Sequence, residues 1–155
     1  MQTLSFDVNY DYTLIGIHTI EEDYRLAYLI NQKINTCLEK AKNNLDFTNK
    51  NASFCIFEFR DKQNFTDYFL IANKSENLED SSNSETLFEE TSEVLEKAVY
   101  LIPEKKKVDY FLKIDRDLGK NDMDNLINQI NEIEQVITSY SIIPKSLKSK
   151  DFLIF

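Results

Sequence analysis

Hydrophobic residues recur along the first part of the chain at two periods, which separate a strand from a helix. Residues 12–17 are mostly β-branched, aromatic or aliphatic, and this composition predicts a strand. Thr19 and Glu22 have the spacing of a capping box, which predicts a helix from there to about residue 41. Apolar residues three and four positions apart predict one buried helical stripe, widened by Tyr24 and Tyr28: Ala27, Ile30, Ile34, Cys37, Leu38 and Ala41.

Two alternating segments, residues 53–60 and 65–72, predict a β-hairpin around the turn-rich loop 61–64. Pairing Arg60 with Phe65 places an almost wholly apolar set on one face: Cys55, Phe57, Phe59, Thr66, Tyr68 and Leu70. The opposite face mixes apolar and charged side chains: Ile56, Glu58, Arg60, Asp67, Phe69 and Ile71. This asymmetry favours a sheet that helices cover on one side.

A second hairpin is predicted further along the chain. Residues 99–102 are expected to be extended because Pro103 follows them, and residues 108–114 alternate as the next strand. In a simple hairpin register, Tyr110 lies beside Tyr100.

The C-terminal part of the chain predicts one more helix and one more strand. Asn121 and Asp122 mark a helix start with acidic residues in the first turn. Its buried stripe is expected to contain Met123, Leu126, Ile127, Ile130, Ile133 and Ile137. Residues 136–143 then predict a strand that Pro144 stops, and the apolar residues 151–155 are expected to dock on the core.

These elements predict a single α+β domain over residues 1–155, which is long enough for one core. The expected order is β-α-β-β-β-β-α-β, with an antiparallel sheet of about six strands and two main helices on one face. This arrangement resembles ferredoxin-like and ACT-type domains, and such a likeness implies little about function.

Charge is distributed unevenly over the domain. The net charge is −9, and residues 76–96 hold eight acidic residues without one Lys or Arg. Residues 74–92 therefore predict a flexible acidic loop. The overall field would repel a polyanion, so nucleic acid is not an expected partner. Two basic clusters, Lys105–Lys107 and Lys145, Lys148 and Lys150, are solvated turns or surfaces that face the acidic segment or a partner.

A signature lies between the predicted strands, where Ile102-Pro103-Glu104 is followed after three residues by Val108-Asp109-Tyr110. It matches the motif of the bacterial IPExxxVDY family, and this chain resembles that family at every fixed position. Residues 23–27 extend the resemblance less specifically. The resemblance implies kinship but carries no known activity, cofactor or site residue.

Composition excludes several classes of chemistry. The two glycines, Gly16 and Gly119, are too far apart for a phosphate-binding loop, and one histidine with two cysteines is too few for a usual transition-metal site, so no cofactor is expected. Cys37 and Cys55 are interpreted as buried, reduced thiols. No apolar run is long enough to span a membrane and residues 1–5 do not begin a signal peptide, which predicts a cytoplasmic protein without a membrane partner.

Six residues remain as candidates for contacts with a partner or ligand: His18, Asp23, Arg25, Glu104, Asp109 and Tyr110. His18 precedes the predicted helix start, where amides attract anions, although a surface or capping neighbour is the simpler interpretation. Asp23 and Arg25 are interpreted as a surface pair. Glu104 and Asp109 are expected to stabilise the turn and hairpin, with partner recognition and catalysis as alternatives, and Tyr110 is expected to be a core aromatic residue.

The leading hypothesis is a small non-catalytic protein-interaction or regulatory module with an unidentified protein partner. The first alternative is an ACT-like domain that senses a small molecule. The second is an enzyme, which would need a cleft that joins His18 or Tyr110 to Glu104 or Asp109. Homodimerisation stays open, because the edge strands of such sheets need cover.

Overall fold

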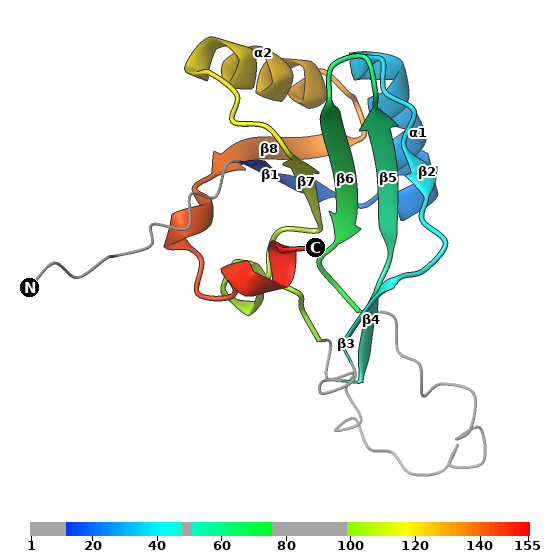
Figure 1. The fold of residues 1–155 in the computed structure, drawn as a ribbon, viewed down its shortest axis with the longest axis vertical. Helices are drawn as coiled ribbons and strands as arrows, with labels where there is room; N and C mark the ends of the chain where they lie inside the picture. The colour runs from blue at the N-terminus through cyan, green and yellow to red at the C-terminus, as the bar shows by residue number, and fades with distance from the viewer. Residues whose placement is uncertain (1–11, 48–50, 76–98) are drawn as a thin grey trace, which may run out of the picture.

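A six-stranded antiparallel sheet forms the centre of the molecule, in a computed structural model that describes residues 12–47, 51–75 and 99–155 (Figure 1). The strand order is β2-β5-β6-β7-β1-β8. The strands are β1 Thr13–Thr19, β2 Glu39–Lys40, β5 Ile56–Asp61, β6 Thr66–Ala72, β7 Tyr110–Ile114 and β8 Val136–Ile142. With two helices packed on this sheet, the predicted α+β class is confirmed. Residues 76–92 of the predicted acidic loop lie outside the described residues.

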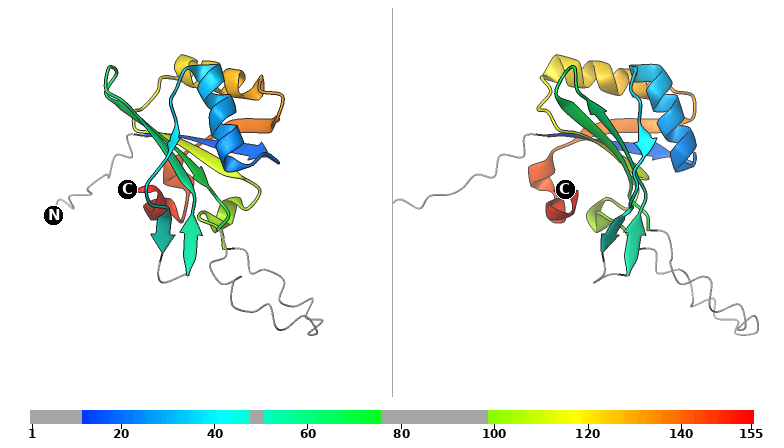
Figure 2. Two further views of the ribbon diagram at one scale, coloured as in Figure 1. Left: turned by 90° about the vertical axis from the view of Figure 1, so that its right-hand side faces the viewer. Right: turned by 45° about the vertical axis from the view of Figure 1, so that its right-hand side comes forward.

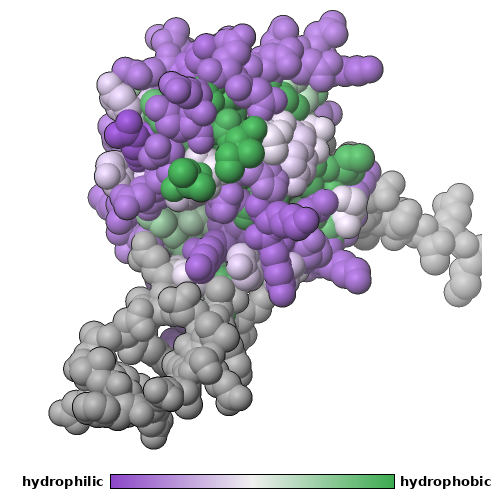
Figure 3. All heavy atoms as spheres, turned by 180° about the vertical axis from the view of Figure 1, so that it is seen from behind, coloured by the Kyte–Doolittle hydropathy of each residue, from purple (hydrophilic) through white to green (hydrophobic). Residues whose placement is uncertain are grey.

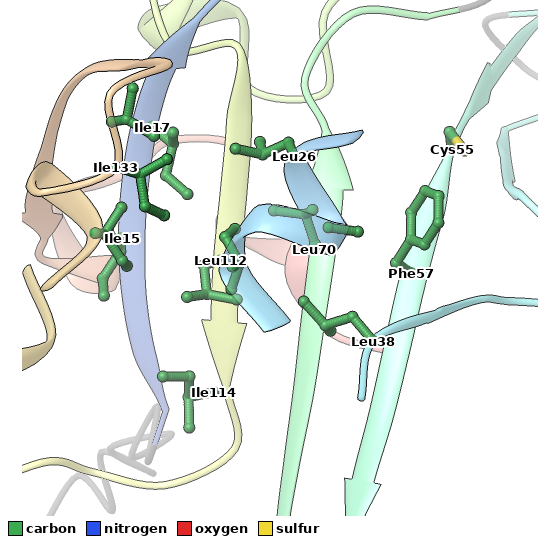
Figure 4. Packing of buried hydrophobic residues seen from close by; sticks show 14 residues of the cluster. Ile15, Ile17, Leu26, Leu38, Cys55, Phe57, Leu70, Leu112, Ile114 and Ile133 are labelled. Carbon is green, nitrogen blue, oxygen red and sulfur yellow. The ribbon is translucent and has the colours of Figure 1, made fainter. Parts of the chain in front are cut away.

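Both helices cover the same face of the sheet (Figure 2). Leu26, Ala27 and Ile30 of α1 (Asp23–Ile34) and Ile130 of α2 (Lys120–Asn131) are buried there. They pack on the inward side chains of four strands, many of which Figure 4 displays: Ile15, Ile17, Cys55, Phe57, Leu70, Leu112 and Ile114. Among the described residues, no helix is long and apolar enough to cross a membrane.

The other face of the sheet carries a second core, where the sequence pattern predicted only partial packing. Short elements cover it: the two-stranded sheet of β3 (Leu45–Phe47) and β4 (Ala52–Phe54), and the 3₁₀ turns η2 (Pro103–Lys105), η3 (Pro144–Ser146) and η4 (Lys150–Leu153). Leu147 and Leu153 are buried in this core, so the expectation that the C-terminal residues dock is confirmed.

The β5–β6 hairpin has the predicted faces in a different register. Arg60 pairs with Asp67, two positions from the predicted partner Phe65. Because side chains alternate with a period of two, this shift leaves each residue on its predicted face. Phe57 and Leu70 accordingly belong to the helix-covered core, and Ile56 and Phe69 to the second core.

The first helix is shorter than predicted at both ends. Thr19 is the last residue of β1, and its hydroxyl donates to the backbone oxygen of Gln135 at 2.7 Å, so the predicted capping box does not form. The N-cap is Glu22, without a side-chain hydrogen bond. Asn35 ends the helix in the left-handed conformation (φ 57°), where the sequence pattern predicted a helix to residue 41.

Some of the residues predicted to be buried are exposed. Cys37 follows the helix and is exposed, whereas Cys55 is buried as expected. Tyr24 and Tyr28 lie on the outer side of α1, and Ile137 belongs to β8 with 70% of its surface exposed. Seen from behind, the surface of the molecule carries hydrophobic residues among hydrophilic ones (Figure 3).

The segment before the motif does not form the predicted strand. Residues 99–102 contribute only an isolated bridge between Tyr100 and Lys74, and β2 supplies the sixth strand instead. Tyr110 consequently does not lie beside Tyr100. It pairs with Ile17 of β1 and Ala72 of β6, in the interior of the sheet.

An asparagine near the end of each helix protects an edge of the sheet. The amide of Asn131 accepts a hydrogen bond from the Ser139 backbone N–H at 2.7 Å and donates to the Ser139 oxygen at 3.4 Å. Likewise, the side-chain amide of Asn31 accepts a hydrogen bond from the Leu38 N–H at 2.8 Å and donates to the Leu38 oxygen at 3.1 Å, just before β2. Each side chain thus replaces a neighbouring strand at an edge that would otherwise be open to pairing.

Replacing Asn131 by alanine should lower the free energy of unfolding by about 1–2 kcal/mol, because Ser139 loses partners for its buried backbone groups. Asn31→Ala should lose a similar amount. Urea denaturation measures both effects. The matched control is Asn128→Ala on an exposed position of α2, which should stay within about 0.5 kcal/mol of the parent. A loss in Asn131→Ala no larger than in this control would contradict the role in edge protection.

Candidate functional site

The IPExxxVDY motif forms the turn through which the chain enters β7. A buried side chain, Asn73, holds this turn from inside. Its amide donates to the backbone oxygens of Lys105 and Val108, both at 2.8 Å, and accepts from the Ile102 N–H at 2.9 Å. Ile102 and Val108 are buried in the second core. The apolar residues of the motif therefore anchor it, and Asn73 satisfies the backbone groups that they carry inward.

Glu104 reaches the C-terminal segment. Its carboxylate accepts hydrogen bonds from the Ser149 N–H at 2.8 Å and the Ser149 hydroxyl at 3.0 Å. Burial acts to raise the pKa of Glu104, but hydrogen bonds from Ser149 and from the backbones of Glu104 and Lys148 together hold the pKa below its usual value. Glu104 therefore clamps η2 to the turn between η3 and η4.

Asp109 stabilises the end of β1. Its Oδ2 accepts a hydrogen bond from the Thr19 N–H at 2.9 Å, and its own N–H donates to the Ile17 oxygen at 3.0 Å. The β1–β8 register shifts between His18 and Thr19. The carboxylate thus replaces a strand partner for an amide at an irregular point of the sheet.

Tyr110 ties the motif to the start of α1. Its hydroxyl donates to the Glu21 oxygen at 3.2 Å. Burial raises the pKa of Tyr110, and the charges of Asp23 and Asp109 raise it further. The phenol is therefore held in its neutral form. As predicted, Tyr110 packs against the helix-covered core.

The remaining candidates are divided between two places. Arg25 pairs with Glu21 at 3.3 Å and not with Asp23, whose carboxylate accepts from the Tyr24 N–H, so the predicted pairing of Asp23 with Arg25 is wrong. His18 lies near the end of the interior strand β1, paired with Thr138 of β8, and its Nε2 is 3.0 Å from the Tyr140 hydroxyl. The structure thus brings Asp23, Arg25, Asp109 and Tyr110 to one junction, whereas the side chains of His18 and Glu104 contact other elements.

The Glu104 clamp joins two lysine-rich turns that are distant in the sequence. We call the resulting region the lysine surface: Lys105, Lys106, Lys107, Lys145, Lys148 and Lys150. The three turns that carry these residues, light green, orange-red and red, lie next to one another in Figures 1 and 2. Lys106 lies 5.9 Å above the ring of Tyr100, and no ion pair between described residues involves Lys105, Lys106 or Lys107.

A buried lysine, Lys113, lies on the second face of the sheet. Lys113 is 4% exposed, and its Nζ lies 4.2 Å from the ring centre of Phe155, 5.0 Å from Tyr12 and 5.5 Å from Phe69. Burial lowers its pKa, against the opposing effect of Asp115, whose carboxylate is 3.4 Å away. Cation–π contacts and this ion pair offset part of the cost of burying the charge.

Next to this cluster, and sharing Phe69 and Phe155 with it, is an open cavity of about 180 Å³. The loop after β2 and one face of β5 form the rest of its lining, including Glu58 and Arg60. The described residues contain no group of three His, Cys, Asp or Glu side chains that could hold a metal ion.

Sequence reasoning missed Asn73 and Ser149, which support the motif, and the burial of Lys113. Asn73 and Ser149 carry no local signal, because each is polar within or beside a segment whose role depends on contacts distant in the sequence. Lys113 offered one indirect signal, a charge at an alternating position of a strand that is otherwise apolar.

No protein-family model matches the chain, and no curated protein or solved structure is significantly similar to it. The resemblance to the IPExxxVDY family therefore rests on the motif residues.

Glu104→Gln should destabilise the protein in a pH-dependent manner. The folded-state pKa of Glu104 lies below its ordinary value of 4.5, so its stabilisation is present above that value and is lost as the pH falls through the folded-state pKa. The melting temperature of the parent should exceed that of Glu104→Gln at pH 7, and the difference should narrow below about pH 4. Glu134→Gln, at an exposed position, is the control; a gap of equal size at all pH values would refute the clamp.

Proposed function

We propose that this chain is a non-catalytic, cytoplasmic protein-interaction module related to the IPExxxVDY family, which docks an acidic segment of a partner protein on the lysine surface. The observation that carries the proposal is the pair of hydrogen bonds from Ser149 to Glu104. They join the basic turn of the motif to the basic C-terminal turns. A fixed acidic residue thus assembles a surface of the opposite charge.

The lysine surface is electrostatically suited to an acidic partner. Lys106, Lys107, Lys145 and Lys148 are exposed, and they outnumber the Glu104 carboxylate, which keeps its negative charge while it accepts from Ser149. A single exposed lysine contributes little to affinity, but several within a Debye length of about 8–10 Å act together on an approaching charge. Such a patch raises the association rate and selects the sign of the partner.

The motif residues support a structural role over a chemical one. Glu104, Asp109 and Tyr110 each bind a backbone group of a different segment. A general acid or base must instead reach a reacting group in a cleft. The same bonds fix the turn that presents Lys105, Lys106 and Lys107.

A short acidic peptide is a better partner for this surface than nucleic acid. The chain has a net charge of −9, so a long polyanion meets repulsion beyond the lysine surface. A peptide with a few acidic residues can remain within the patch, where screening by salt hides the more distant charges.

Reversing three charges of the lysine surface should weaken the binding of an acidic peptide. For the variant Lys106→Glu, Lys107→Glu and Lys148→Glu, we expect the affinity for a fluorescent decaglutamate probe to fall at least about tenfold at low salt. Fluorescence anisotropy measures this change. Parent binding should itself weaken as salt is added.

The control carries Lys40→Glu, Lys62→Glu and Lys120→Glu, which alter the net charge by the same amount on exposed positions elsewhere. Equal losses in the two triple variants would reject a local site. Another outcome is that the parent protein fails to bind the probe, while only the lysine-surface variant shows a lower melting temperature at low salt. That result would reject the proposal and assign the lysines to contacts within the chain.

A further inference from the structure

The cavity on the second face has walls of two kinds. Its apolar side chains come from four parts of the chain: Ala41 and Leu45, Ile56, Phe69, and Phe155. Phe155 packs edge-on against Phe69, with ring centres 5.1 Å apart. Polar groups complete the lining, from Asn43 and Asn44 in the loop after β2 and from Glu58 and Arg60 on β5.

The size of the cavity limits the ligand to a small molecule. Its volume of about 180 Å³ corresponds to roughly six water molecules at about 30 Å³ each. Pockets for drug-sized ligands and larger cofactors start near 300 Å³. A molecule of the size of an amino acid can therefore fit within it.

Two opposite charges stand at the polar side of this cavity. Glu58 and Arg60 alternate along β5 and lie on the same face of the strand. Arg60 Nη2 is 3.9 Å from Glu58 Oε2, at the outer limit of an ion pair, and the two side chains are 62% and 38% exposed. Such an exposed pair contributes little stability, so a ligand can separate it at little cost.

Asp67 makes the arginine a better binding group. Its carboxylate holds Arg60 Nη1 at 3.3 Å from the adjacent strand. The guanidinium is thereby oriented, and its second terminal nitrogen remains turned toward the weakly held Glu58. A planar guanidinium of this kind suits a carboxylate, and Glu58 can accept hydrogen bonds from an ammonium group.

We propose that this cavity binds a free α-amino acid with an apolar side chain. The ligand carboxylate contacts Arg60, its ammonium group contacts Glu58, and its side chain lies against Ile56, Phe69 and Phe155. This site is separate from the lysine surface and adds a small-molecule-binding role to the interaction role.

Isothermal titration calorimetry on the full chain tests the proposal with L-leucine, L-methionine and L-phenylalanine. At least one should bind saturably. Its N-acetyl derivative, which lacks the ammonium group, and its amide, which lacks the carboxylate, should each bind about tenfold more weakly. Arg60→Gln should weaken the free amino acid by about tenfold but should not weaken the amide further.

Glu58→Gln should mirror this result, weakening the free amino acid and not its N-acetyl derivative. Lys62→Gln, in the exposed turn of the same hairpin, is the control and should bind as the parent does. No saturable binding up to about 10 mM, or equal binding of the amide and the free amino acid, would overturn the proposal.

The lysine-surface triple variant separates this site from the proposed function. It should bind the amino acid with unchanged affinity even if it loses the acidic peptide. Loss of amino-acid binding in that variant would place the ligand elsewhere and would overturn the assignment to the cavity.

Discussion

The buried side-chain amide of Asn73 holds the turn through which the chain enters β7, and the rest of the fold depends on this turn. β7 lies between β6 and β1, so the chain must enter an interior position of the sheet through a tight turn. Ile102 and Val108 carry the backbone of that turn into the second core, where water cannot satisfy it. Asn73 binds three of these backbone groups and, through its own main chain, also bonds Leu101 and Asp109. By satisfying these groups, one side chain offsets the free-energy cost of burying the backbone of the motif.

The fixed positions of the motif extend this bracing to three other segments. Glu104 holds the C-terminal turns, Asp109 the end of β1, and Tyr110 the start of α1. Val108 completes the arrangement by packing over Gly16, where an added Cβ would come within 3.2 Å of it and within 2.8 Å of Ile142. The three open positions of the motif are lysines in this chain, and they face outward. The fixed positions of the motif thus hold the structure together, and the open positions carry the lysines of the proposed recognition surface.

Alternation proved a more dependable guide to this fold than local caps or turns. The faces of β5 and β6 were predicted correctly although their register was not, because a shift of two residues keeps every residue on the same face of the sheet. The predicted capping box failed because Thr19 bonds to Gln135, more than a hundred residues away. Residues 99–102 have the composition of a strand, but Asn73 binds the N–H groups of Leu101 and Ile102, and only an isolated bridge forms. Local pattern cannot reveal a competitor that is distant in the sequence.

The candidate sites were less predictable than the fold, for the same reason. His18, Asp23 and Arg25 were prominent because of their types, yet their partners are ordinary surface neighbours. The face of β5 that carries Glu58 and Arg60 seemed only half able to pack. Its charges become part of the lining of an open cavity because Phe155 and the loop after β2 also line it. A solvent-facing strand pattern and a cavity wall have the same sequence signature until the covering segment is known.

The C-terminal segment contributes residues to both proposed sites. Ser149 carries the Glu104 clamp, and Phe155, six residues later, lines the cavity and covers Lys113. Leu153, fully buried between them, makes the segment one packed unit. A ligand that moved Phe155 would act on the same unit that presents Lys148 and Lys150. If a ligand in the cavity changed the free energy of partner binding at the lysine surface, partner binding would change the free energy of ligand binding by the same amount. Burial of Leu153 is therefore the contact through which small-molecule binding and partner docking would be coupled.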